Sequence, residues 1–137
     1  MKKLTLLFIC SLLLFSCKKE KDTIPFNEHF DTTNATLISQ ASFSSNAHSV
    51  SGTVKLYLKN GVKNLVFENL KADDGPDLKA YMSTTTGNSD YASLGELKST
   101  TGTFYYTVDS TINTSTHNYV LIWCEAHSVL FGNAHLQ

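Results

Sequence analysis

The sequence contains no arginine, and its 11 lysines face 12 acidic side chains. Proteins that bind nucleic acid neutralise phosphate groups with clusters of basic side chains. The region expected to fold contains no such cluster. The composition therefore argues against a nucleic-acid partner.

Cysteine is also scarce, and the first of the three cysteines lies in a segment that has the pattern of an export signal. Lys2 and Lys3 precede an apolar run, Leu4 to Phe15, that is short for a bilayer span and typical of a signal peptide. The run ends in Leu-Phe-Ser-Cys17, which resembles the lipobox of bacterial lipoproteins. In that family the chain is cut before the cysteine, whose sulfur then carries a diacylglycerol. The resemblance implies a signal peptide over residues 1–16 and a membrane anchor on Cys17, facing the periplasm or the cell surface.

This processing would leave a single thiol in the mature chain. Cys10 would leave with the signal and Cys17 would be lipidated, so Cys124 would stand alone in a compartment that is often oxidising. No internal disulfide can then form. Loss of Lys2 and Lys3 would leave nine lysines against 12 acidic side chains, a formal net charge of −3.

Two regions follow the cleavage site. Residues 17–35 are charged and then polar, with no sustained periodicity, which indicates a tether; Phe26 and Phe30 near its end are candidates for docking on the domain. Residues 36–137 are long enough for one domain with one core.

The pattern of the domain has period two, as expected for β-strands. In the run Ser51–Lys59, Val54, Leu56 and Leu58 fall on one face. Asn60-Gly61 follows, a strong hairpin signal, and the chain runs back from Val62 to Leu70. Further strand-like runs are Leu37–Phe43, Leu78–Met82, Thr103–Val108, Tyr119–Cys124 and Ser128–Ala134. About seven to eight short strands predict an all-β fold, an antiparallel sandwich or barrel.

The run Tyr119–Cys124 is apolar on both faces, which predicts a central strand that is covered on both sides. Cys124 ends this strand, next to the polar pair Glu125-Ala126. Such a thiol can either react at the strand end or pack in the core as a small hydrophobe. Glu125 disfavours a thiolate, and His127 is the nearest side chain that a turn would bring close to favour one.

Two short patterns suggest metal sites, and both have simpler interpretations. Cys124, His127 and His135 offer ligand types but match no zinc spacing, and ordinary hydrogen-bonded histidines are expected instead. The acidic stretch around Gly75, Pro76 and Asp77 lacks the closing glutamate of a calcium loop and is predicted to be a structural turn. We expect no dedicated metal site.

Four segments in register resemble one known family. They are His48 to Val54, Asp74 to Ser83, Leu94 to Lys98 with Gly102 to Tyr106, and Val120 to Leu136, the last with the pairs Trp-Cys and Phe-Gly. Together they resemble the DM-thirteen domain, also called the electron-transfer DM domain, a small extracytoplasmic β module. The resemblance covers residues 36–137. It implies a redox role in which Cys124 acts as a bare thiol or as a ligand to a prosthetic group such as haem.

The sequence departs from that family at two positions. His127 stands where an aromatic residue is expected, and Val108-Asp109 replaces an Ile-Pro pair. His127 is therefore either a tuning group or a substituted ring.

Two functions follow. The first is a membrane-anchored extracytoplasmic redox or electron-transfer accessory module, rather than a stand-alone enzyme. In it Cys124 works with a redox protein partner and is tuned by His48 or His127. The alternative is a non-catalytic cell-surface binding module, with Cys124 buried in the core and recognition by the loops 83–93 and 109–118.

Overall fold

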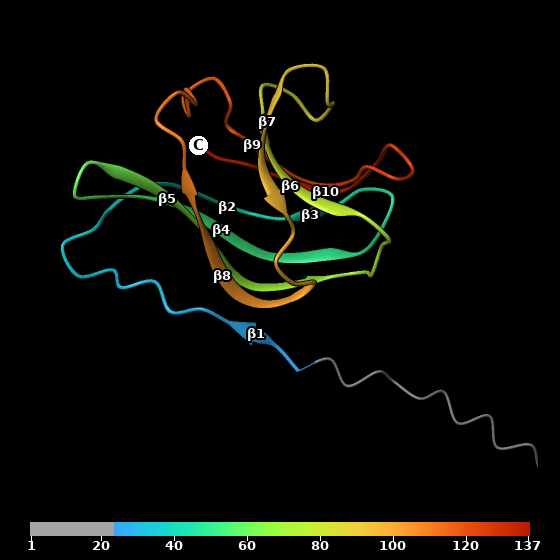
Figure 1. Cartoon of the computed structure of the whole chain (residues 1–137), viewed down its shortest axis with the longest axis horizontal. Coiled ribbons are helices and arrows are strands. Elements are labelled where there is room, and N and C mark those ends of the chain that lie inside the picture. Colours follow the sequence, from blue (N-terminus) through green and yellow to red (C-terminus); the bar gives the residue numbers. More distant parts are fainter. Residues whose placement is uncertain (1–23) are drawn as a thin grey trace, which may run out of the picture.

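The computed structural model describes residues 24–137, so the predictions for the signal peptide 1–16 and for Cys17 concern residues outside this range. The described chain forms ten strands in two five-stranded sheets that face one another as a sandwich (Figure 1). The all-β prediction is confirmed, with more strands than expected. Within residues 24–137 no helix is long and apolar enough to cross a membrane.

The first sheet has the order β1-β8-β5-β4-β2, and all its pairs are antiparallel except β1 with β8. Its strands are β1 (Phe26–Asn27), β2 (Thr36–Ser42), β4 (Val50–Lys59), β5 (Val62–Ala72) and β8 (Thr101–Val108). The predicted hairpin joins β4 to β5. Asn60 and Gly61 both have positive φ, +51° and +77°, as a tight turn that follows the twist of the strands requires.

The second sheet is wholly antiparallel and has the order β3-β10-β9-β6-β7. Its strands are β3 (Ser44–Ser45), β6 (Leu78–Ser83), β7 (Tyr91–Glu96), β9 (Tyr119–Cys124) and β10 (Val129–His135). The predicted run 37–43 lies in β2 except for its last residue, the buried Phe43, where the chain passes from the first sheet to β3 of the second.

The core lies between the sheets and follows the predicted alternation in most places. Val54 and Leu56 of β4 are buried there, together with Phe67 and Phe104. Leu58 was expected on the same buried face but is 38% exposed. It lies two residues before the Asn60-Gly61 turn, near the tip of the hairpin.

The end of the predicted tether is part of the fold. β1 pairs with Gly102 and Thr103 of β8, and the Phe26 ring lies 6.3 Å from that of Phe104. The Phe30 ring lies 5.4 Å from Tyr57 and 5.2 Å from Tyr105. Both phenylalanines therefore dock on the first sheet.

β7 was not predicted from the sequence, and its first half lies in the expected loop 83–93. The strand is at the edge of its sheet and has no fully buried residue, so it lacks the hydrophobic alternation that marks a strand. The connecting loop is accordingly shorter and covers residues 84–90.

The docking of β1 predicts an effect of Gly102→Ala. Gly102 has a φ of +131°, and a Cβ there would fall on the carbonyl oxygen of Phe26. Strain of this kind costs about 1–3 kcal/mol, so we expect a lower free energy of unfolding and faster hydrogen exchange at the Glu28 amide, which donates to Thr103. Gly87→Ala is the matched control, since its Cβ would meet only Thr85 at 3.5 Å. Equal exchange in both variants would contradict this packing.

Acid is expected to loosen the same segment. The Glu28 carboxylate accepts a hydrogen bond from Lys98 Nζ at 2.7 Å, which lowers the pKa of Glu28. A lowered folded-state pKa contributes stability that is present above the unfolded pKa, about 4.3, and is lost as pH falls through the folded value. The rate of hydrogen exchange near β1 should therefore rise in that acid range. The rise should correspond to the free energy of an exposed ion pair, about 0.2–1 kcal/mol. Glu28→Gln should remove this pH response.

Candidate functional site

Cys124 is the last residue of β9, and its side chain points into the core. It is 0% exposed and belongs to the buried cluster that also holds Leu78 and Phe131. Its backbone neighbours are Leu78 on β6 and Val129 on β10. Cys124 is the free cysteine of residues 24–137. The thiol is therefore at the strand end but is packed and closed to solvent.

A short turn covers the end of this strand. Glu125 to Ser128 connect β9 to β10, and all four residues are exposed. Two backbone hydrogen bonds hold them: the Glu125 amide donates to Asp77 at 2.9 Å, and the Ser128 amide donates to Glu125 at 3.4 Å. Ser128 also has a positive φ, +51°. The Glu125 carboxylate also accepts a hydrogen bond from Tyr81, so this turn is the cover over the strand end that carries the thiol.

The predicted turn at Gly75, Pro76 and Asp77 lies beside it. A Cβ on Gly75 would come within 2.8 Å of the Phe131 ring and 2.9 Å of Leu78, so only glycine allows this close packing. Asp77 accepts the bond from Glu125 through its backbone and lies 3.2 Å from Lys79 Nζ through its carboxylate. The acidic stretch is thus bonded within the chain.

The two histidines suggested as tuning groups lie at this end without bonding to the thiol. His127 is exposed in the turn. His48 stacks on Phe131 with ring centroids 3.9 Å apart, and its Nδ1 lies 3.5 Å from Asp73. Between residues 24 and 137 no hydrogen bond joins either histidine to Cys124, and no group of three or more potential ligands could hold a metal. His48 contacts the thiol's cluster through Phe131, on whose ring it stacks and whose carbonyl accepts from its amide at 3.4 Å.

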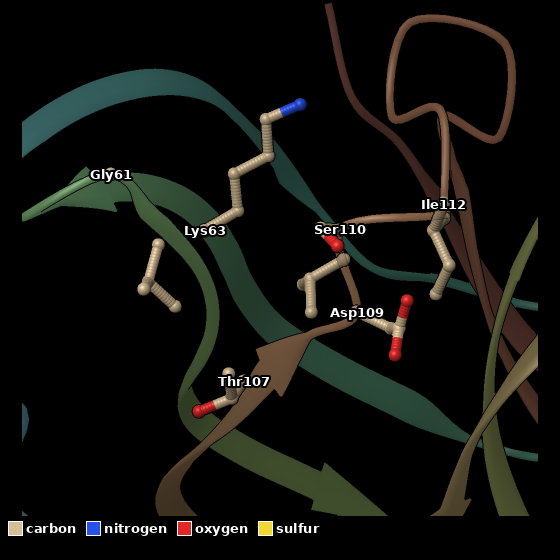
Figure 2. A pocket seen from close by; sticks show the side chains of 8 residues that line it. Gly61, Lys63, Thr107, Asp109, Ser110 and Ile112 are labelled. Atoms are coloured by element: carbon tan, nitrogen blue, oxygen red, sulfur yellow. The ribbon is translucent and has the colours of Figure 1, made fainter.

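The surroundings of Cys124 do not fit a haem. Ligation would require an open side at the sulfur and a cavity for the macrocycle, whereas Cys124 is fully enclosed. A cavity of about 440 Å³ lies at the tip of the β4–β5 hairpin, between residues 61–63 and 107–112 (Figure 2). A second, of about 300 Å³, lies near Ile38 and Leu136. Cys124 lines neither cavity.

The opposite face of the second sheet carries an aromatic cluster that sequence reasoning did not single out. Tyr81 of β6 is 1% exposed, and its ring centroid lies 6.4 Å from Trp123 of β9 and 4.2 Å from Tyr91 of β7. The Tyr81 hydroxyl donates to Glu125 Oε1 at 2.5 Å. Burial, and then this bond to a carboxylate, raise the pKa of Tyr81 well above its usual range.

Lys79 completes the polar side of the cluster. Its Nζ lies 2.8 Å from Glu96, 3.2 Å from Asp77 and 4.0 Å from Glu125. These contacts, led by the hydrogen bond to Glu96, raise the pKa of Lys79 above its usual range. The only sequence signal for the cluster was alternation, which places Lys79 and Tyr81 on one face of β6.

The burial of Cys124 predicts different effects for two substitutions. Cys124→Ser places a hydroxyl in the apolar core and should lower the free energy of unfolding by about 1–3 kcal/mol. Cys124→Ala removes one heavy atom and should cost about 1 kcal/mol. Urea unfolding of both variants measures the difference. A serine variant as stable as the wild type would mean that the thiol has a polar partner or solvent.

Comparison with known proteins agrees with this architecture. Residues 42–136 match the family model described as Electron transfer DM13, which runs from the last residue of β2 through β10 and includes Cys124. No curated protein and no solved structure matched the chain. Because the family model covers well over half of the sequence, the chain belongs to the Electron transfer DM13 family.

Proposed function

We propose that this protein is a membrane-anchored, extracytoplasmic electron-transfer accessory module whose working group is the thiol of Cys124. The observation that carries the proposal is the family match: the family is described by electron transfer, and Cys124 is the single cysteine of the matched region. Anchoring would come from a lipid on Cys17. The electron partner would be another redox protein on the same side of the membrane.

The thiol would react by exchange. On opening of the Glu125–Ser128 turn, the Cys124 thiol loses its proton to solvent and its sulfur attacks a partner disulfide. A mixed disulfide forms, and the partner's second sulfur leaves as a thiolate. A thiolate of a second, donor protein then attacks the Cys124 sulfur and releases the partner as a dithiol. The donor's other thiol displaces Cys124 and closes the donor's disulfide, so two electrons pass from the donor dithiol to the partner disulfide. The chain's own contribution is to keep the sulfur out of water between these events.

The complete burial of Cys124 supports a second candidate, a non-catalytic binding module in which the thiol only fills the core. Recognition would then fall to the loops 84–90 and 109–118. These loops lie at the same end of the sandwich (Figure 1), and His117 Nε2 of one lies 3.3 Å from Asp90 Oδ1 of the other.

Thiol labelling of the native protein separates the two. We expect the reduced full chain in detergent to react with a thiol reagent at a rate that is insensitive to low urea. Local opening of a turn exposes little surface and needs less free energy than global unfolding. Cys124→Ser is the blank.

The binding module makes the opposite prediction. If Cys124 is reached only by global unfolding, the labelling rate rises with urea along the slope of the global transition. That result would end the thiol proposal.

A further inference from the structure

The outer face of the second sheet holds three rings of a kind that can be oxidised by one electron. Trp123, Tyr81 and Tyr91 lie on three adjacent strands, β9, β6 and β7, with centroid separations of 6.4 Å and 4.2 Å. We propose that these rings form a one-electron relay in which Glu125 accepts the phenolic proton of Tyr81. The thiol chemistry proposed above uses none of the three rings.

The exposure of the three rings gives the relay an inner part and an outlet. Trp123 is 8% exposed and Tyr81 is 1% exposed, whereas Tyr91 on the edge strand is 41% exposed. Trp123 is also the residue before Cys124, although their side chains point to opposite faces of the sheet. An electron can thus pass between the neighbourhood of the thiol and the β7 edge, where a partner can approach Tyr91.

Glu125 supplies what oxidation of a buried tyrosine needs. A phenol that loses an electron becomes a strong acid, so the charge stays buried unless a base takes the proton at once. Glu125 Oε1 already accepts the Tyr81 hydrogen bond at 2.5 Å. Before oxidation the proton stays on the phenol, in line with the raised pKa of Tyr81.

No other tyrosine hydroxyl has such a partner in the described part of the chain. The Tyr106 hydroxyl donates to the backbone carbonyl of Glu96 and accepts from the Lys98 amide. Tyr119 stacks on His135 at 4.1 Å. Tyr81 therefore combines a carboxylate base with two neighbouring rings.

A one-electron oxidant, of the class of high-potential haem or copper centres in a partner protein, takes one electron through Tyr91. The O–H bond of Tyr81 breaks, and its proton moves to Glu125. The products are a neutral phenoxyl radical, a neutral carboxylic acid and the reduced partner centre. One electron from a reductant, passed by way of Trp123, which ends unchanged, and the proton from Glu125 restore Tyr81.

This inference rests on the proposed electron-transfer function but not on the reactivity of Cys124. Its test uses the full chain in detergent and azidyl radicals generated by pulse radiolysis as the oxidant. The sequence has one tryptophan, so the indolyl absorption reports Trp123 alone. We expect the indolyl radical to decay as a phenoxyl radical appears, at a rate independent of protein concentration.

Three variants identify the path. Tyr81→Phe keeps the ring and removes the hydroxyl, and should slow the decay at least about tenfold. Glu125→Gln keeps the shape and removes the base, and should slow it similarly, since a positioned base contributes roughly 10²-fold or more. Tyr119→Phe, on the same face of β9, is the matched control and should leave the rate within about twofold of the wild type.

Unchanged decay in Tyr81→Phe would overturn the relay. Should that variant fold poorly, Tyr91→Phe tests the outlet instead: the phenoxyl radical should form normally but be reduced by added ascorbate at least about tenfold more slowly. Ascorbate reduction at the wild-type rate in Tyr91→Phe would also overturn it.

Cys124→Ser separates this inference from the thiol proposal. Radical transfer in this variant at the wild-type rate is the expected result, and its loss would show that the path runs through sulfur instead. If transfer depends on Tyr81 but native thiol labelling fails, the relay stands and the thiol proposal falls. If native labelling succeeds but radical transfer is unchanged in Tyr81→Phe, the relay is wrong and the thiol proposal stands.

Discussion

The coverage of β9 on both faces is the constraint on which the rest of this structure depends. The strand pairs with β10 on one side and β6 on the other, and its residues from Val120 to Cys124 are all buried. Its inner side chains complete the sandwich core. Leu121 and Trp123 lie on the outer face, where they pack with Tyr81. Because successive residues point to opposite faces, one strand places a thiol and an indole on two sides of one sheet.

This arrangement gives the two redox-capable faces different properties. The inner face is closed, so the Cys124 thiol has no contact with solvent while the turn after it is in place. The outer face is also packed, but its rings are in sequence: Trp123 lies next to Tyr81, and Tyr81 lies next to the exposed ring of Tyr91. Glu125 takes part in both faces. Its amide donates to the Asp77 carbonyl in the turn that covers the thiol, and its carboxylate accepts the hydrogen bond from the Tyr81 hydroxyl. A movement of Glu125 would therefore affect both faces together.

Prediction from the sequence succeeded where a residue's environment follows from local periodicity. Tyr119–Cys124 was predicted with its observed bounds, and Asn60-Gly61 marked the hairpin because its backbone needs positive φ at both positions. β7 and β1 were not predicted, because edge strands that are short or exposed carry no alternation of apolar and polar residues. The pairing of Tyr81 with Glu125 was also out of reach, since it depends on the register between β6 and the end of β9. Alternation placed Cys124 on one face but did not show what covers it.

The pairing of β1 with β8 also sets how much of the tether lies between Cys17 and the folded domain. Only eight residues separate Cys17 from Phe26, and fully extended they reach roughly 30 Å, about the diameter of a small domain. If Cys17 carries the proposed lipid, the first sheet is held near the bilayer by its β1 edge while this pairing lasts. Release of β1, which acid favours through Glu28, together with release of Phe30 from Tyr57 and Tyr105, would free residues up to Thr36 and about double the reach. The distance between the domain and the membrane would then depend on whether the two residues of β1 stay paired with Gly102 and Thr103 of β8.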